Sequence, residues 1–356
     1  MEKEFIKNGA RYIQGLIDEA RGAKVAELTL SGRYEIDGEI RLPSGFTLIL
    51  CDCHLRLTDG SYTNIFVNEK HGTTENRSAA GADRGIRILG VGEAVLDGGE
   101  YNGLSEKTQN KNGMPPIWKN NFILFTNVDG FEIDGLTLVN MRWWATNFIF
   151  CRNGKIRNIK LLASDAAVDS SGNIYRGLRQ DAYSEILIKN ADGIDLRCGC
   201  NNILVENVSG FTEDDTVALT GLYGDLEREF FVSDLPSDIA NITVKGVSGA
   251  AYCALVRLLN QDGIKMHDIT VDGVVDESLA SPHLDRGAYG VRIGDTHLYG
   301  KRYPTPDELY NITVRNIYAE GLFAITLAAS PKNLTLENIK AHEGTAPLRD
   351  DRSVIK

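Results

Sequence analysis

The sequence predicts an all-β, single-domain fold, a parallel β-helix with an N-terminal capping helix. Two observations predict it. A short strand-like segment recurs along most of the chain, and the ends of these segments are rich in glycine and asparagine. The 356 residues include 36 glycines but only 9 prolines. Glycine without an every-third-residue period excludes collagen, and the regular apolar content excludes disorder.

The first element is a helix. Residues 4–21 carry apolar side chains at helical spacing, and Gly22 follows as a stop signal. The residues on this apolar face are Ile6, Ala10, Ile13, Leu16, Ile17 and Ala20. We therefore expect residues 1–24 to form a helix that covers the open end of the β-helix.

A repeat with a period-two pattern takes over from about residue 25. Each copy has a small polar residue or glycine, then apolar, variable, apolar, variable, Asn or Gly, and apolar. The copies are residues 130–136, 153–159, 202–208, 241–247, 268–274, 311–317 and 333–339. The intervals between the starts of successive copies are unequal, and some are about twice as long as others.

One strand per repeat cannot bury its apolar face alone, but stacked repeats can, and their strands then pair in parallel. Asn and Gly tolerate the left-handed backbone of tight turns, and stacked Asn side chains can hydrogen-bond from turn to turn. Short intervals fit one turn, while long ones fit a turn plus a loop, or two turns. A leucine-rich repeat would show its Leu-x-x-Leu-x-Leu pattern, and a propeller would have a longer period. We assign the β-helix to residues 25–341 and a polar tail to residues 342–356.

Composition narrows the possible partners. The formal net charge of −11 argues against nucleic acid or an anionic membrane as partner. The chain has no apolar run long enough to predict a membrane span, and the first residues lack a secretion signal, so we expect a cytoplasmic location. The six cysteines lie in strand-like segments and are expected to be reduced. No His/Cys spacing is typical of a metal site, so neither metal nor cofactor is expected. The oligomeric state is not predicted.

Acidic residues gather at two places one short repeat apart. Asp192 and Asp195 precede Asp214 and Asp215, and the interval from Asp192 to Asp214 equals that between the last two copies of the repeat. Equivalent positions on adjacent turns lie about 4.8 Å apart, which predicts stacked carboxylates. Such stacking raises at least one pKa, and paired carboxylates serve glycosidic hydrolysis, one as acid and one activating water. Turn-capping or solvated aspartates would give the same spacing.

These residues resemble a known family. Asn-Ala-Asp-Gly at 190–193, followed by Glu-Asp-Asp at 213–215, is similar to the Asn-Thr-Asp-Gly and Gly-Asp-Asp hallmarks of glycoside hydrolase family 28. That family comprises polygalacturonase-like, right-handed parallel β-helices. The likeness spans about residues 25–340, with Gly-Val-Arg-Ile at 290–293 as a further matching segment.

The resemblance implies roles for several residues. Asp214 would be the general acid, while Asp192 and Asp215 would hold and activate the attacking water in an inverting mechanism. Arg292 would bind the substrate, typically through a sugar carboxylate. Asn190 would orient the carboxylates.

The sequence departs from the family at three positions. The family histidine one turn after the Asp pair is missing, and Ala251-Tyr252-Cys253-Ala254 stands there instead. Gly294 replaces the lysine after Arg-Ile, and Glu213 replaces a glycine. These departures predict a different sugar or linkage, or a weak or lost activity.

Three further residues are candidates for substrate binding. Arg257 could replace the missing cationic contact. Trp144 could provide a platform for a sugar ring. Tyr252 lies in the segment that stands in the region of the missing family histidine.

The leading hypothesis is an inverting glycoside hydrolase that acts without metal on a galacturonide-like or related plant-type oligosaccharide. One alternative is a polysaccharide lyase on the same scaffold, which would need calcium and an Arg or Lys base. Another is a β-helix that binds glycans without turnover.

Overall fold

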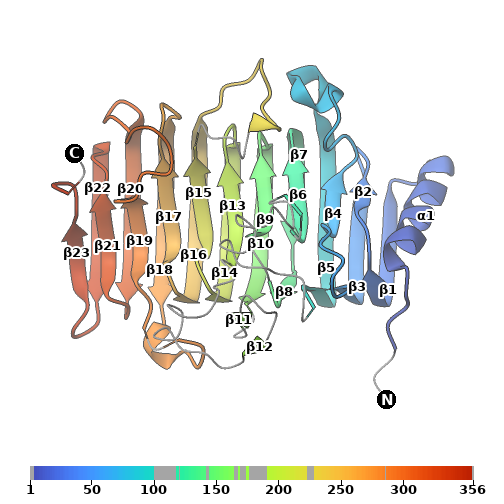
Figure 1. Cartoon of the computed structure of the whole chain (residues 1–356), viewed down its shortest axis with the longest axis horizontal. Helices are drawn as coiled ribbons and strands as arrows, with labels where there is room; N and C mark the ends of the chain where they lie inside the picture. Colours follow the sequence, from blue (N-terminus) through green and yellow to red (C-terminus); the bar gives the residue numbers. More distant parts are fainter. Residues whose placement is uncertain are drawn as a thin grey trace.

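The computed structural model confirms the predicted fold class. Two parallel sheets run the length of the molecule and enclose its core, and the termini lie at opposite ends (Figure 1). The structure describes residues 4–99, 118–119, 121–141, 144–163, 191–222, 228–284 and 286–354, together with strand backbone at 167–168 and 174–175.

The first sheet has eleven strands, paired in chain order. Its strands are β1 Glu27–Ile36, β3 Thr47–Leu57, β5 Asp83–Asp97, β7 Val128–Asp134, β8 Thr137–Val139, β10 Arg152–Leu162, β14 Asn201–Thr212, β16 Ile239–Ala251, β18 Met266–Asp276, β20 Leu309–Ala319 and β22 Lys332–Ala341. β7 and β8 pair with successive halves of β10, and long strands bend where a residue in their middle, such as Asn158, adopts left-handed backbone.

The second sheet has ten strands and supplies the other wall of each turn. Its strands are β2 Ile40–Leu42, β4 Phe66–Asn68, β6 Ile123–Thr126, β9 Trp144–Ile149, β13 Asp192–Arg197, β15 Val217–Gly221, β17 Ala254–Asn260, β19 Tyr289–Gly294, β21 Phe323–Ala328 and β23 Ala346–Asp350. Outside both sheets, β11 Ala167–Val168 pairs with β12 Ile174–Tyr175 in antiparallel fashion.

The seven repeats form consecutive strands of the first sheet, β7, β10, β14, β16, β18, β20 and β22. The strand register pairs equivalent positions of successive copies, even across the two longest intervals. Gly154 pairs with Ile203, and Ile269 pairs with Ile312. The long intervals are therefore one turn plus a loop, rather than two turns.

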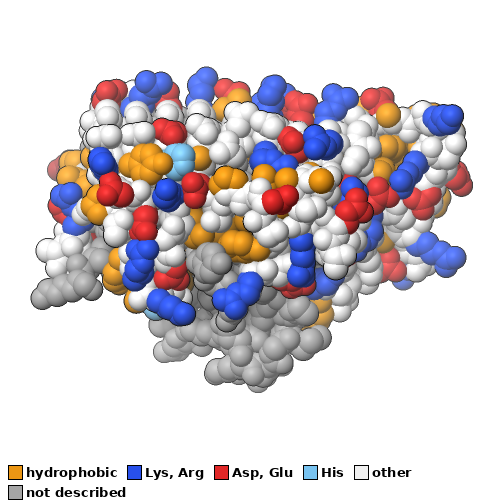
Figure 2. Space-filling view, turned by 90° about the horizontal axis from the view of Figure 1, so that it is seen from above, with side chains coloured by type: hydrophobic (Ala, Val, Ile, Leu, Met, Phe, Trp, Pro, Cys, Tyr) orange, Lys and Arg blue, Asp and Glu red, His pale blue; other side chains and the backbone are white. Residues whose placement is uncertain are grey.

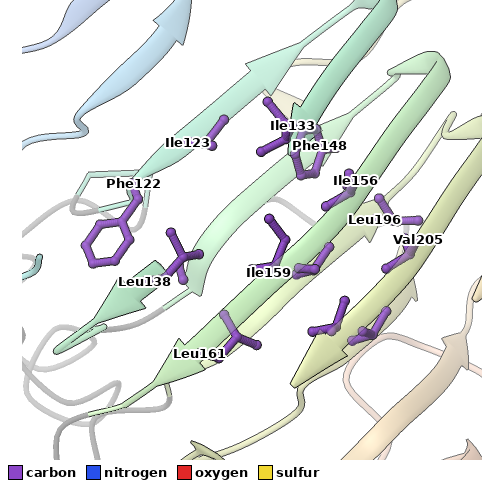
Figure 3. Close-up of a cluster of buried hydrophobic side chains, with 14 of the residues drawn as sticks. Phe122, Ile123, Ile133, Leu138, Phe148, Ile156, Ile159, Leu161, Leu196 and Val205 are labelled. Atoms are coloured by element: carbon purple, nitrogen blue, oxygen red, sulfur yellow. The ribbon is translucent and has the colours of Figure 1, made fainter. Parts of the chain in front are cut away.

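Aliphatic side chains stack inside the β-helix from turn to turn. Ile133, Ile156 and Val205 are register partners on β7, β10 and β14, and all three are buried. Phe148 and Leu196 of the second sheet belong to the same buried cluster (Figure 3). This packing explains the period-two pattern, because alternate residues of each strand point into the core.

Two columns of asparagines connect the turns on the outside. Asn202 Nδ2 donates to Asn153 Oδ1 at 2.7 Å, and Asn207 Nδ2 donates to Asn158 Oδ1 at 2.7 Å. All four residues adopt left-handed backbone with φ of 54–56°. The first column starts the strands and the second lies where they bend, which is why the repeat carries Asn or Gly at both places.

The N-terminal helix caps the β-helix as expected. Helix α1, Gly9–Gly22, buries Ile13 and Ile17 against the first turn. Gln14 Oε1 accepts a hydrogen bond from the backbone amide of Arg41 at 2.8 Å. This hydrogen bond satisfies a backbone donor on the free edge of β2. The helix starts later than predicted, because Ile6 pairs with Tyr34 on β1. None of the helices in the described residues has the length and apolarity to cross a membrane.

The sequence predicts a polar tail over residues 342–356, but part of this segment belongs to the second sheet. Ala346–Asp350 form β23, which pairs in parallel with β21, so that Phe323 lies opposite Ala346. This last strand lies at the end of the sheet, where most of its side chains are exposed, and this position explains its polar sequence.

We expect Asn207→Ala to lower the free energy of unfolding by about 1–2 kcal/mol, because alanine strains the left-handed backbone and breaks the ladder. Urea unfolding followed by circular dichroism measures this. Asn207→Gly is the matched control, since glycine keeps the backbone conformation and should cost less than alanine. Equal losses for both variants would contradict the backbone argument.

Candidate active site

The candidate site lies where the chain turns from the first sheet into the second. Asp192 opens β13, and Asp214 and Asp215 lie in the turn between β14 and β15. We call Asp192, Asp214 and Asp215 the carboxylate cluster. The register pairs Ile194 with Val217, so Asp192 lies opposite Asp215. The prediction that Asp214 lies directly opposite Asp192 is therefore wrong by one position, because this turn is slightly longer than the spacing suggested.

Hydrogen bonds hold this turn in place. The Asp215 amide donates to Asp192 Oδ1 at 3.1 Å, and the Gly193 amide donates to the Asp215 carbonyl at 2.9 Å. A Cβ on Gly193 would come within 2.5 Å of the Thr216 carbonyl oxygen, so glycine is required for the close approach. Asp192 and Asp215 are buried, whereas Asp214 is half-buried.

Burial and like charges act together on Asp192. Burial, followed by the neighbouring carboxylates of Asp195, Asp214 and Asp215, raises the pKa of Asp192 well above its usual range. The amide of Asp215 opposes this rise but does not cancel it. Asp192 therefore holds a proton at pH values where an exposed aspartate is ionised.

Two arginines are aligned on adjacent strands beside the carboxylate cluster, and one of them contacts it. Arg257 of β17 and Arg292 of β19 are register partners. Arg257 Nη1 donates to Asp215 Oδ2 at 3.1 Å, and its Nη2 binds Asp295 Oδ2. Arg292 Nη2 donates to Asp295 Oδ1 at 2.5 Å. We call Asp215, Arg257, Asp295 and Arg292 the arginine network.

Arg257 keeps its positive charge despite being buried. Burial opposes the charged form of Arg257, but the carboxylate of Asp215 raises the pKa of Arg257 well above its usual range. Buried ion pairs of this kind persist only when the charges are matched and hydrogen-bonded. Asp215 thus has a fixed cationic partner, whereas Asp192 makes no ion pair with any of the described residues.

Cys253 stands beside the carboxylate cluster. One ligand atom each of Asp214, Asp215 and Cys253 lies within 4.8 Å of the others. Burial, then Asp215 and Asp214, raises the pKa of the Cys253 thiol, which favours the protonated form. Arg292 Nη1 contacts Cys253 Sγ at 3.6 Å and Arg257 occupies Asp215 Oδ2. Two guanidinium groups on the candidate ligands disfavour a metal cation at these atoms.

Trp144 does not form the open platform that the sequence suggested. It is 7% exposed, and its ring packs against the Arg197 guanidinium at 3.9 Å. Arg197 Nε donates in turn to Asn147 Oδ1 at 2.7 Å. Trp144 is paired with Asp192 in the register and faces a covered aromatic cluster, so it supports the strand that bears Asp192.

Of the two remaining predicted residues, Tyr252 and Asn190, the structure describes only Tyr252. Tyr252 is partly exposed, and its amide donates to the carbonyl of Thr212 at 3.2 Å, next to the carboxylate turn. Asn190 lies outside the described residues.

Sequence reasoning missed Asp295, Tyr299 and Arg197. Asp295 closely follows Arg292 in the chain, a spacing that is compatible with an ion pair and could have drawn attention to it. Tyr299 and Arg197 were missed because the contacts that place them at the site are with Arg257, and with Asn147 and Trp144, which are distant in sequence.

The molecular surface shown in Figure 2 intersperses Lys and Arg with Asp and Glu side chains. Nucleic-acid-binding surfaces instead gather basic side chains on one face. The described residues on this face do not form such a basic patch.

The fold and the site define a parallel β-helix protein with aspartates aligned on adjacent turns. The model of the glycosyl hydrolases family 28 matches residues 35–227, just over half of the chain. The chain belongs to this family. No curated protein matches the chain.

Solved structures with the same fold include several glycosidases. The polygalacturonase from Erwinia carotovora ssp. carotovora has a TM-score of 0.56 at 13% identity, covering 97% of this chain and 93% of that chain. An exopolygalacturonase from Thermotoga maritima has a TM-score of 0.53 at 16% identity, with 92% and 81% covered. An iota-carrageenase complexed to iota-carrageenan fragments has a TM-score of 0.60 at 12% identity, with 98% and 88% covered. These likenesses support the fold.

We expect Arg257→Met to destabilise the protein by about 3–5 kcal/mol, because it leaves buried carboxylates without their partner. Adding Asp215→Asn to that variant should recover part of the loss. Urea unfolding of both variants tests this. Arg315→Met is the matched control, because Arg315 pairs with Asp272 at 2.9 Å on the surface and should cost under about 1 kcal/mol. Similar losses for Arg257→Met and Arg315→Met would contradict the buried-network argument.

The raised pKa of Asp192 has a predictable effect on stability. A carboxyl whose folded-state pKa exceeds its unfolded value of about 3.9 loses stability as the pH rises through the folded-state pKa. Asp192→Asn should therefore be more stable than the wild type at pH 8, with the difference shrinking towards pH 4. Thermal unfolding between pH 4 and pH 8 measures it. A constant difference across this range would show that Asp192 keeps an ordinary pKa.

Proposed function

We propose that the carboxylate cluster hydrolyses a glycosidic bond with inversion, on a galacturonide-like or related oligo- or polysaccharide. One observation carries the proposal: adjacent turns bring carboxylates together in unlike surroundings. Asp215 is paired with Arg257, while Asp192 is buried beside three other carboxylates, and Asp214 is half-buried. Pairs of carboxyls whose environments differ are the usual basis for dividing acid and base roles.

The role of each carboxyl follows from its surroundings and from the family. Asp214 is partly accessible, as a group that protonates a leaving oxygen must be, and the family assigns it that role. Asp215 accepts a hydrogen bond from the Arg257 guanidinium, and a carboxylate held in this position suits the activation of water. Asp192 accepts the Asp215 amide and, when protonated, can donate to the same water or to the sugar. Inverting hydrolysis needs one acid and one base on opposite faces of the sugar.

Asp192 offers a second assignment, because its raised pKa suits a general acid. An activated aryl glycoside as substrate distinguishes Asp192 from Asp214 as the general acid. Its leaving group departs without being protonated, so its hydrolysis does not need the general acid. The variant that lacks the general acid should lose much less rate on the aryl glycoside than on the natural linkage.

The two arginines support recognition of a polar or acidic sugar beside the carboxylates. Arg292 has a buried Nε without a hydrogen-bond partner among the described residues, so it can turn a donor towards a ligand after a small shift. Gly294, in place of the family lysine, leaves less positive charge next to it. The proteins of the similar structures are named a polygalacturonase and an iota-carrageenase, which makes acidic polysaccharides the first substrates to test.

We expect Asp214→Asn and Asp192→Asn each to reduce turnover about 10²–10⁴-fold with little loss of fold. A reducing-sugar screen over oligogalacturonides, rhamnogalacturonan fragments, carrageenan and neutral galactosides measures it, and proton NMR of the first product shows inversion. Asp272→Asn, on the exposed ladder, is the matched control.

The contrary outcomes are specific. Equal sugar release by wild type and both variants would overturn the site. An unsaturated product that absorbs in the ultraviolet, formed only with calcium, would instead identify a lyase. Binding without any release would identify a glycan-binding β-helix.

A further inference from the structure

An exposed tyrosine stands at the edge of the arginine network. Tyr299 lies in the loop after β19 and is 49% exposed. Its hydroxyl accepts a hydrogen bond from Arg257 Nη2 at 3.0 Å and donates to Asp295 Oδ2 at 3.3 Å. Arg257 and Asp295 are both buried, so the hydroxyl lies at the enclosed end of the side chain, where burial raises the pKa of Tyr299 to about 12. The exposed part of the side chain is therefore its ring.

The loop that carries Tyr299 is held rigidly. Gln261 Oε1 accepts the amides of Tyr299 at 2.8 Å and of Gly300 at 2.9 Å, and Gln261 Nε2 donates to the His297 carbonyl at 2.9 Å. The His297 amide donates to Asp295 Oδ1 at 2.9 Å. An aromatic ring that is anchored in this way loses little conformational entropy on binding a ligand.

A single guanidinium separates this ring from the carboxylate cluster. Arg257 binds Asp215 through Nη1 and the Tyr299 hydroxyl through Nη2, and its guanidinium lies 5.5 Å from the centre of the Tyr299 ring. The ring of His297 meets the Tyr299 ring edge-on, with centroids 4.5 Å apart. An apolar ring is thus bordered by polar side chains, next to the groups proposed to cleave the sugar.

We infer that Tyr299 forms a saccharide-binding subsite, on which the C–H face of a pyranose ring packs next to the cleaved bond. A pyranose has an apolar C–H face and a rim of hydroxyl groups. Tyrosine supplies a matching apolar surface, while His297 and the carboxylates and guanidiniums around it can bind the hydroxyls. The inference rests on the proposed function of the carboxylate cluster. It also replaces Trp144, which is covered by Arg197, as the aromatic platform.

Binding is tested in an Asp214→Asn background, which suppresses turnover. Electrophoresis through gels that contain polygalacturonate, iota-carrageenan or neutral galactan gives the affinity for each polymer. We expect Tyr299→Ala to weaken binding about tenfold, equivalent to a stacking energy of about 1.4 kcal/mol. Tyr299→Phe keeps the ring and should stay within about threefold of the parent. Tyr12→Ala, which removes a 51% exposed tyrosine from α1, should bind as the parent does.

Each outcome decides the inference separately from the proposed function. Unchanged affinity in Tyr299→Ala, or an equal loss in Tyr299→Phe, would overturn the platform, even if the wild type hydrolyses the polymer. A parent that binds none of the three polymers would also overturn it. Loss of binding in Tyr299→Ala alone, with no hydrolysis by the wild type, would confirm the subsite and overturn the hydrolase.

Discussion

The left-handed turn residues are the constraint on which the rest of this structure depends. Asn158 and Asn207 bend long strands of the first sheet, and their side-chain amides bind the turn before. Because several turns are tied to their neighbours at these columns, the register cannot slip by one position without breaking the ties and turning the aliphatic side chains outward. The same ties let loops of different length leave the β-helix without disturbing its core, since short and long intervals alike close a single turn.

That fixed register brings the carboxylates of the site together, and it also forces them to repel one another. It places Asp192 opposite Asp215 on adjacent turns, where neither carboxylate can move away from the other. Two features of the site reduce this repulsion. Asp192 takes up a proton, and Asp215 receives the guanidinium of Arg257 from the next strand of the same sheet. A flexible scaffold would relieve the repulsion by separating the groups, and would then lose the difference in their surroundings.

The repeat and the capping helix could be predicted because their signals are local and recur. Each copy of the repeat shows the period-two pattern by itself. The interval between successive copies equals the sequence separation of the residues that pair between strands β7 to β22. The carboxylates were found through two short motifs, but their alignment was missed by one position, because spacing in sequence does not show the length of a turn. Asp295 and Tyr299 follow β19 in a loop whose path depends on Gln261, which directly follows β17 on the preceding turn. Trp144 was misjudged because the sequence does not show that Arg197 covers it.

The departures from the family can be understood through the charge of the site. A histidine beside the carboxylates would bring a positive charge, whereas the Cys253 thiol that lies beside them here is held neutral by burial and by Asp215. The cation comes instead from Arg257, two strands of the second sheet after Asp192, and Asp295 shares Arg257 and Arg292. Because Asp295 offsets one of the two guanidinium charges, the site is less cationic than its two arginines suggest. A substrate would therefore be recognised more by shape and hydroxyl contacts than by its charge, which places more of the binding energy on aromatic surface such as Tyr299.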